Sequence, residues 1–446
     1  MQTRFAPDGD LRARGDLRER VQADLQTARR DTLALFDLAS EAELHKSPGF
    51  GFRPVIWHLA HTGAFESYWI AQRMMNLPPV DERYERIFDP IKTPREQSKD
   101  LPSRREMEDY LRRARETTLT CLDKIDFTQN DPLLHNGYVF DLVLEHERQH
   151  QETLAYLLHL LEPSKKRSNG ASIKSTPIGS VKPSDEMIAF PAADFPLGAS
   201  ADRFAYDNEL PQHSVHVPAF KLERFPVTNE RFAEFVQAGG YAKREWWDDE
   251  GWAWREKENV TAPLHWSRVN EDRWTARRMF DESELQADHP VCGISWFEAR
   301  AFAGFAGKRL PTEAEWERAA SCNQSTGMKR RYAWGDEEPD HARCNFDNEF
   351  WGTTAVGAFP AGASPEGCLD LNGNVWEWTS STFAGYPNFT AFPYREYSEE
   401  WFDGDHRVLK GGSWATRASI LRTSFRNFFR RPFRIAFAGV RLAEDC

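Results

Sequence analysis

The segment His146-Glu147-Arg148-Gln149-His150-Gln151-Glu152 places two histidines four residues apart inside an apolar run from Phe140 to Leu161. The length and apolar character of this run predict an α-helix. Residues at positions i and i+4 lie on one face of an α-helix, so both imidazoles can reach the same metal ion. This segment therefore predicts a helix that supplies two ligands to a metal site.

A second pair of histidines offers the third ligand. His58 and His61 belong to the string Trp57-His58-Leu59-Ala60-His61, within an apolar-aromatic stretch from Pro54 to Met75 that also predicts a helix. The two histidines are three residues apart and partly share a helix face, so spacing alone does not choose between them. Three imidazoles that converge from two helices would form a metal site, and such a site indicates that a reaction takes place at the metal.

Helical patterns run through the first third of the chain. Two amphipathic stretches, Asp16 to Ala39 and Arg104 to Ile125, complete a set of four predicted helices in residues 11–162. Four helices of this length predict an up-down bundle, whose interior commonly holds metal ligands. The connection between the second and third helices, about Leu77 to Pro102, is long, as functional loops often are.

The pattern changes after residue 162. Residues 163–185 are rich in Ser, Lys, Gly and Pro and predict a linker. In residues 186–446 the predicted elements are short and turns are frequent, and this region holds 14 of the 16 tryptophans. We therefore expect a multidomain chain, an α domain followed by an α+β domain with much irregular structure. Short helices are predicted at Asn229–Ala238, Ser295–Ala306 and Thr312–Ala320.

The composition argues against several classes of partner. The net charge of −12 argues against a nucleic-acid-binding surface. No apolar run is long enough to span a bilayer, and the N-terminus does not have the pattern of a signal peptide. The six cysteines are scattered without a CxxC motif, as is typical of reduced thiols. We expect a cytoplasmic protein that binds neither nucleic acid nor membrane.

Six short strings follow one another in the second half of the chain. They are Phe225–Asn229, Pro290–Trp296, Arg309–Glu317, Gly373–Trp378, Gly411–Trp414 and Gly439–Arg441. In this order they resemble the sulfatase-modifying-factor fold, a C-type-lectin-like domain also used by formylglycine-generating enzymes. We expect the strings to be mainly architectural, as turns, buried indoles and buried ion pairs. The region Arg422 to Arg434 lacks the paired cysteines of formylglycine-generating enzymes, which argues against formylglycine chemistry.

The first half resembles a different family. His146, His150 and Glu152 form an HxxxHxE motif that, together with the Trp57–His61 string, resembles the DinB-like metal-binding four-helix bundle. Such a bundle ahead of the lectin-like domain is the layout of the ergothioneine-type sulfoxide synthases, and Phe392–Ser398 resembles that branch in particular. The resemblance covers nearly the whole chain. It implies a DinB-like bundle at residues 11–162 and a sulfatase-modifying-factor domain at residues 186–446.

This resemblance implies a reaction and a metal. The enzyme would be a non-haem iron(II), O2-dependent sulfoxide synthase. It would join the imidazole of hercynine, the trimethylated betaine of histidine, to a cysteine-type thiol. The iron ligands would be His61, His146 and His150, because relatives commonly lack a histidine at the position of His58. His58 and Glu152 would then help to orient the ligand imidazoles, although a solvated carboxylate at Glu152 and simple packing of His58 remain alternatives.

The resemblance also implies roles for two tyrosines and for the hercynine pocket. Tyr394 would donate a proton near the iron, and Tyr397 would line the pocket. Gln149 would bond the substrate imidazole and Asn427 the betaine carboxylate. Phe428, at a position usually held by tryptophan, would face the quaternary ammonium as a weaker cation–π partner. The alternative for the aromatic residues is structural packing.

Three positions bear on the identity of the sulfur donor. Lys92 and Arg95 have the spacing of a basic pair that, in relatives, binds carboxylates of the donor, although both would also fit as surface charges. Phe429 stands where relatives that use γ-glutamylcysteine tend to carry an acidic residue, and Lys92 replaces an arginine. These differences favour free cysteine over γ-glutamylcysteine.

Other functions compete with this interpretation. DinB-like bundles also bind zinc or nickel and activate small thiols, so a metal-dependent thiol transferase is the main alternative. A related synthase that takes histidine in place of hercynine, or a selenium donor in place of sulfur, is another. A non-catalytic lectin-like module would predict loss of the ligand histidines, and all three are present.

Overall fold

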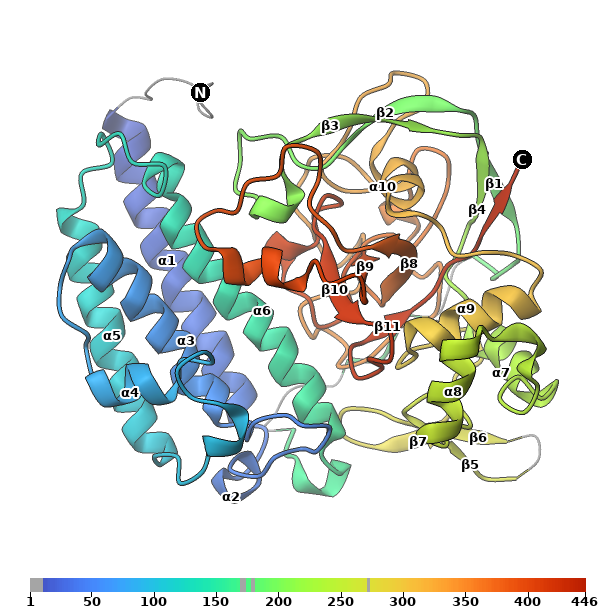
Figure 1. Cartoon of the computed structure of the whole chain (residues 1–446), viewed down its shortest axis with the longest axis horizontal. Helices are drawn as coiled ribbons and strands as arrows, with labels where there is room; N and C mark the ends of the chain where they lie inside the picture. Colours follow the sequence, from blue (N-terminus) through green and yellow to red (C-terminus); the bar gives the residue numbers. More distant parts are fainter. Residues whose placement is uncertain (1–10, 169–173, 178–180, 271–272) are drawn as a thin grey trace. The chain divides into compact units, whose positions relative to one another are not determined.

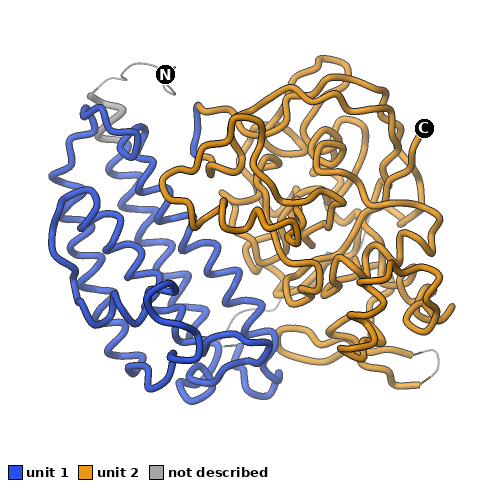
Figure 2. The backbone as a smooth tube through the Cα atoms, viewed as in Figure 1, with its two compact units in different colours: residues 1–172, 202–204 blue, residues 173–201, 205–446 orange. Residues whose placement is uncertain are grey.

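Residues 11–168, 174–177, 181–270 and 273–446 are described by the computed structural model. Parts of the predicted linker, residues 169–173 and 178–180, lie outside these ranges. The chain divides into two units, the first formed by residues 1–172 with 202–204 and the second by residues 173–201 with 205–446 (Figure 2). None of the described helices has the length and apolar character needed to cross a membrane.

Unit 1 is built on long helices that lie side by side (Figure 1). α1 packs against α6 and α3 packs against α5, while α3 also contacts α6. The π-helical segment η1 continues α3 without a break. The bounds of these elements are α1 (Leu11–Phe36), α3 (Trp57–Glu66), η1 (Ser67–Met74), α5 (Arg104–Lys124) and α6 (Tyr138–Leu160).

Local signals explain where these helices begin. α5 starts at a capping box, in which the Ser103 side chain accepts from the backbone N–H of Glu106 and the Glu106 carboxylate accepts from that of Ser103. α6 follows Gly137, whose φ of 78° lies in the left-handed region that favours glycine. A short helix, α2 (Glu41–Leu44), lies in the connection after α1.

The long connection predicted at Leu77–Pro102 is not entirely a loop. It contains the helix α4 (Glu82–Ile87). The Asp81 side chain caps this helix by accepting from the backbone N–H groups of Arg83 and Tyr84. The sequence analysis did not anticipate a helix over these six residues, because an apolar pattern this short is not recognisable.

The described residues of unit 2 form four small sheets. The central one has four strands in the order β10-β9-β8-β11, with β11 parallel to β8 and the other pairs antiparallel. A second has the order β1-β4-β12, so the last strand of the chain pairs beside the first strands of the unit. The remaining sheets are β2-β3 and β5-β6-β7. The bounds are β1 (Met187–Phe190), β2 (Ala193–Leu197), β3 (His213–Val217), β4 (Phe220–Glu223), β5 (Trp266–Arg268), β6 (Trp274–Arg277), β7 (Glu282–Glu284), β8 (Trp376–Thr382), β9 (His406–Lys410), β10 (Asn427–Arg430), β11 (Ala438–Gly439) and β12 (Ala443–Asp445).

Short helices lie against these sheets. The three predicted ones form, and each begins at a Ser or Thr whose side chain accepts from a backbone N–H of the first turn: Thr228, Ser295 and Thr312. A fourth helix was missed, because its glycine and closely spaced tryptophans do not repeat with a helical period. The bounds are α7 (Asn229–Gln237), α8 (Asp249–Lys257), α9 (Trp296–Phe305) and α10 (Glu313–Ser321).

A buried ion pair joins three of the six strings of unit 2. Arg441 is fully buried and its Nη2 lies 2.9 Å from a carboxylate oxygen of Glu377. The same guanidinium donates to the carbonyl oxygens of Glu223 and Leu369, and the indole of Trp316 donates to Glu377 at 2.6 Å. The strings therefore serve as scaffold, because their charged and polar groups satisfy one another inside the unit.

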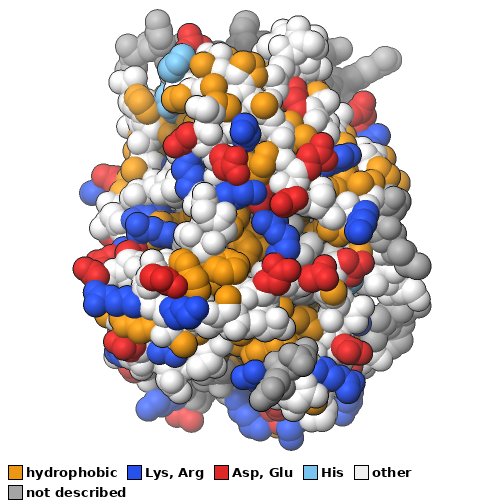
Figure 3. All heavy atoms as spheres, turned by 90° about the vertical axis from the view of Figure 1, so that its right-hand side faces the viewer, with side chains coloured by type: hydrophobic (Ala, Val, Ile, Leu, Met, Phe, Trp, Pro, Cys, Tyr) orange, Lys and Arg blue, Asp and Glu red, His pale blue; other side chains and the backbone are white. Residues whose placement is uncertain are grey.

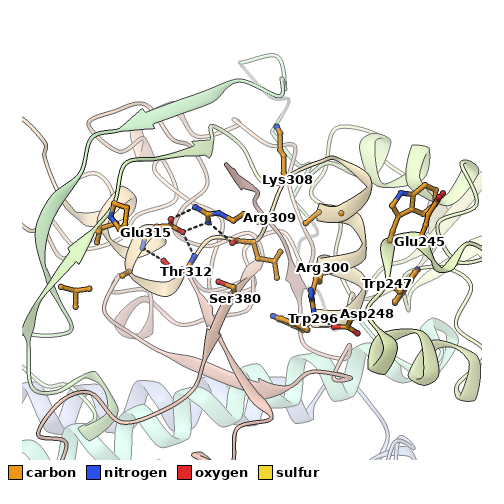
Figure 4. Close-up of a pocket in the computed structure, with 18 of the residues that line it drawn as sticks. Glu245, Trp247, Asp248, Trp296, Arg300, Lys308, Arg309, Thr312, Glu315 and Ser380 are labelled. Carbon is orange, nitrogen blue, oxygen red and sulfur yellow. Dashed lines mark hydrogen bonds and ion pairs between the residues drawn. The ribbon is translucent and has the colours of Figure 1, made fainter. Parts of the chain in front are cut away.

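An open cleft of about 920 Å³ lies on unit 2. Figure 4 shows the ion pair of Arg309 and Glu315, 2.8 Å apart, on one side and Trp296 beside Arg300 on the other. None of the residues that were predicted to bind substrate or metal lines this cleft. Acidic and basic side chains alternate over the face of the molecule in Figure 3.

The buried pair gives a stability prediction. Arg441→Met leaves the Glu377 carboxylate buried without its charge partner, so we expect the free energy of unfolding of unit 2 to fall by about 3–5 kcal/mol. Lys221→Met is the control, because Lys221 is exposed and lies 3.8 Å from Glu444, and an exposed pair is worth less than about 1 kcal/mol. Urea unfolding followed by tryptophan fluorescence measures both. Equal losses in the two variants would contradict the scaffold role.

Candidate metal centre

Three histidine side chains converge inside unit 1. His61 comes from α3, while His146 and His150 come from successive turns of α6. One ring nitrogen of each lies within 4.8 Å of the corresponding atoms of the other two. The structure therefore brings together the three histidines that the family resemblance implied, at a spacing that one metal ion can bridge.

The ring of His61 is held by a backbone carbonyl and by stacking. Its Nδ1 lies 2.7 Å from the carbonyl oxygen of Phe88, which follows α4. A carbonyl can only accept, so this nitrogen carries the proton and Nε2 keeps its lone pair. The indole of Trp57 stacks on the same ring with centroids 4.4 Å apart. His61 is thus fixed in the tautomer that leaves Nε2 free to bind a metal.

His58 lies beside this group. Its Nδ1 is 3.0 Å from Nδ1 of His150, so one ring donates to the other. If His150 is the donor, its Nε2 is left as a ligand atom and His58 acts as the acceptor that orients it. The structure thus pairs His58 with a candidate ligand, while His61 belongs to the convergent group.

His146 has an unsatisfied ring nitrogen. Its Nδ1 is buried and makes no hydrogen bond to the described protein atoms. Phe65 stacks on the ring with centroids 3.7 Å apart and planes 6° from parallel. A buried imidazole that is held in place but lacks a partner for one nitrogen fits a group that binds a metal ion.

The imidazoles are uncharged at neutral pH. Burial and the nearby charge of Arg53, opposed by the hydrogen bond to the Phe88 carbonyl, together lower the pKa of His61 to about 4. Burial also lowers the pKa of His58 to about 3, with added contributions from His61, Arg53 and Arg95. The pKa values of His146 and His150 lie well below 6.5 because of burial and the neighbouring histidines. All of these rings can therefore offer lone pairs without first losing a proton.

The donor set determines what the site can do. Three neutral imidazoles leave the full positive charge on a bound ion and occupy only three coordination positions. Open positions allow a substrate or a small molecule to bind the ion directly. The arrangement is typical of a catalytic metal site rather than a closed structural one.

The other predicted residues of unit 1 differ in their surroundings. Gln149 is half-buried on α6 between the two ligand histidines, and Glu152 is buried one turn further on. Arg95 lies close enough to His58 to lower the pKa of that imidazole. It also lines a pocket of about 590 Å³ together with Phe52 and Lys99. Lys92 is exposed and paired with Asp89 at 3.0 Å, and it does not line that pocket.

The predicted residues of unit 2 form two groups. Tyr394 and Tyr397 meet edge to face with ring centroids 6.2 Å apart, and Tyr397 stacks on Tyr206. Burial raises the pKa of the Tyr394 hydroxyl, so it stays protonated at neutral pH. Asn427 and Phe428 are neighbours on β10, and the Asn427 side-chain oxygen accepts from the Phe428 backbone N–H.

Sequence reasoning anticipated His58 beside the histidine group but missed the other groups that contact these rings, which are Trp57, Phe65 and the Phe88 carbonyl. Trp57, His61 and Phe65 are spaced by four residues, so their helix face is shared and the aromatic positions around His61 are a usable signal. The Phe88 carbonyl has no such signal, because every residue carries one. Only the path of the connection through α4 brings it to His61.

Comparison with known proteins gives a matching family model for each unit. The DinB superfamily model matches residues 24–154, and the model of the sulfatase-modifying factor enzyme 1-like domain matches residues 174–446. These matches confirm the predicted fold class, a DinB-like four-helix bundle followed by a sulfatase-modifying-factor domain.

Several curated proteins are similar to this chain. The hercynine oxygenase of Mycolicibacterium thermoresistibile is 38% identical over 96% of this chain and 95% of that protein. The hercynine oxygenase of Mycolicibacterium smegmatis is 38% identical over 96% of this chain and 99% of that protein. A formylglycine-generating enzyme of Mycobacterium tuberculosis is 34% identical, but over only 47% of this chain and 77% of that protein. Similarity over almost the full length of both chains shows that this chain belongs to the hercynine oxygenase family.

Proposed function

We propose that this chain is a non-haem iron(II), O2-dependent sulfoxide synthase of ergothioneine biosynthesis. It would join the imidazole of hercynine to a cysteine-type thiol. The observation that carries the proposal is the group of three neutral imidazoles. It occurs in a chain that aligns over 96% of its length with proteins named hercynine oxygenase.

His61, His146 and His150 would hold the iron. The bound ion would supply the redox chemistry that O2 and a thiol require, which zinc in the same ligands would not. The overall reaction balances without another reductant. The imidazole carbon loses its hydrogen and forms the C–S bond, the thiol loses its hydrogen, one oxygen atom ends on sulfur, and the other leaves as water.

Tyr394 would supply the proton that this oxygen chemistry needs. A hydroxyl is useful as a general acid only while it is protonated, and burial of Tyr394 keeps it so at neutral pH. Tyr397 would line the hercynine pocket, and its stacking on Tyr206 at 4.1 Å fixes the plane of its ring.

Hercynine offers an imidazole, a carboxylate and a trimethylammonium group for recognition. Gln149 would hydrogen-bond the imidazole and Asn427 the carboxylate. Phe428 would present a face to the cation, supported from behind by Phe383, which stacks on it with centroids 4.0 Å apart. His58, which contacts His150, and the buried Glu152 would keep the ligand rings in position.

We propose free cysteine as the sulfur donor. Arg95 would bind its carboxylate, since this guanidinium lines a pocket and its charge acts on His58. Lys92 would contribute less, because Asp89 already pairs with it. Phe429 stacks on Phe433 and offers no charge for a longer donor such as γ-glutamylcysteine. All six cysteines of the chain are free, which supports a reducing, cytoplasmic location.

Product analysis tests the proposed function. Protein loaded anaerobically with iron(II) is exposed to air with hercynine and either cysteine or γ-glutamylcysteine. We expect a product with the mass of hercynine plus cysteine plus one oxygen minus two hydrogens. His146→Ala should abolish it, while His216→Ala, an exposed histidine on β3, should not. If neither donor gives product or oxygen uptake, the thiol-transferase alternative becomes the better one.

The role of Tyr394 can be tested separately. Tyr394→Phe removes only the hydroxyl, so we expect the rate of sulfoxide formation to fall by about 10²–10⁴-fold. The iron content should stay that of the unsubstituted protein, because the ligands are untouched. Tyr68→Phe, at an exposed tyrosine, is the matched control. An unchanged rate for Tyr394→Phe, measured by mass spectrometry of the product, would remove this residue from the mechanism.

A further inference from the structure

We propose that a buried ring of four charges in unit 1 positions the two helices that carry the metal ligands. The ring consists of Arg29 of α1, Glu66 of α3, Arg115 of α5 and Glu147 of α6. Each of the four long helices of the bundle contributes one residue. The inference rests on the proposed metal site but not on the proposed substrates.

The contacts alternate in charge around the ring. Arg29 lies 2.8 Å from Glu147 and 2.9 Å from Glu66. Arg115 lies 2.7 Å from Glu66 and 3.4 Å from Glu147. Each arginine therefore meets both carboxylates, and each carboxylate meets both arginines. The exposed fraction is 10% for each arginine side chain, 0% for Glu66 and 2% for Glu147, so the ring is buried.

The ring is charged and balanced. Burial alone would raise the pKa of Glu66, but Arg115 and Arg29 outweigh it and hold the pKa at about 2. Two cations and two anions leave no net charge in the ring. A single substitution would therefore leave an unpaired charge where water cannot reach it, whereas removal of all four charges would not.

Such a ring adds little to the free energy of unfolding. The cost of taking ions out of water often cancels their attraction, and well-packed apolar replacements of buried ion groups are often equally or more stable. The directional hydrogen bonds add a defined geometry, since each guanidinium donates to its partners only in its own plane. An apolar layer would allow the helices to rotate and slide at little cost.

The ring is coupled to the ligands through α6. Glu147 follows His146 directly, and one residue corresponds to about 100° of rotation around a helix, so the ligand face and the ring face are neighbours. Gln151 extends the same face, and its amide donates to Thr32 and to the Ala28 carbonyl of α1 at 2.9 and 2.7 Å. Thr32 in turn donates to Glu147 at 2.8 Å. The rotation of α6 is thereby fixed against α1.

The same argument applies to α3. Glu66 is its last residue, five positions after His61, and both ring arginines hold it. A helix rotation of 20° would move a side-chain end by about 2 Å, whereas metal–ligand distances tolerate only about 0.2 Å. The ring therefore sets the orientation of both ligand-bearing helices to the accuracy that a shared ion requires.

A variant with an apolar ring separates positioning from stability. In Arg29→Met, Glu66→Leu, Arg115→Met and Glu147→Leu combined, all four charges disappear together. We expect a folded protein with a melting temperature equal to or above that of the unsubstituted protein, measured without metal. Its Kd for Co(II), used in place of iron, should rise at least tenfold, with an altered visible spectrum. A folded variant with unchanged Kd and spectrum would overturn the proposal.

A second pair of variants guards against misfolding of the first. Glu147→Gln combined with Arg29→Gln removes one charge of each sign, so the ring stays balanced while its hydrogen bonds weaken, and we expect its Kd for Co(II) to rise at least threefold. Arg148→Gln, the next residue on α6, should leave the Kd unchanged. Equal Kd values in these two folded variants would contradict positioning by the ring.

The Co(II) readout also separates this proposal from the proposed function. Weaker Co(II) binding in the ring variants would support positioning even if no sulfoxide is ever detected. An unsubstituted protein that binds no Co(II) would overturn the metal site and the positioning proposal together.

Discussion

The burial of the imidazoles inside the helical bundle is the constraint on which the rest of the structure depends. His61 is buried and His146 and His150 are half-buried, so the charged form of each ring is disfavoured and the lone pairs stay available. A buried polar ring also needs partners for its remaining nitrogen. The Phe88 carbonyl supplies one for His61, and His58 supplies one for His150.

The two units provide partners for their buried polar groups in different ways. In unit 1, long helices satisfy their own backbones, and four of the buried side-chain charges form one balanced ring. In unit 2, short strands and turns leave many groups to be satisfied by side chains. There Arg441 donates to the carbonyls of Glu223 and Leu369 as well as to Glu377. In both units, these hydrogen bonds and ion pairs hold the segments that they join in a fixed geometry.

The sequence was informative where spacing alone defines geometry. The pair His146 and His150 follows from helical periodicity, and the string motifs of unit 2 identify its fold through family resemblance. The choice of His61 over His58 did not follow from spacing. In the structure His61 belongs to the convergent group, and its ring contacts the carbonyl of Phe88, the residue that follows the unpredicted helix α4.

The charge ring could not be predicted for a related reason. Its partners are 32 to 118 residues apart in sequence, and each taken alone looks like an ordinary charged residue of an amphipathic helix. Pairings across four helices depend on the rotation of every helix at once, which no local pattern records. Local periodicity therefore predicts the helices and the pair of histidines proposed as ligands, whereas the contacts that orient these helices depend on the tertiary fold.

The most direct test of the central claim is the number of protons released when metal binds. Anaerobic calorimetric titration with iron(II) at pH 6.0, in buffers of different ionisation enthalpy, gives this number. Because the ligand rings are already neutral in the metal-free protein, we predict release of less than about half a proton per ion. Three histidines with ordinary pKa values near 6.5 would release about two protons at this pH. That result would contradict the account of a buried, neutral and preformed site.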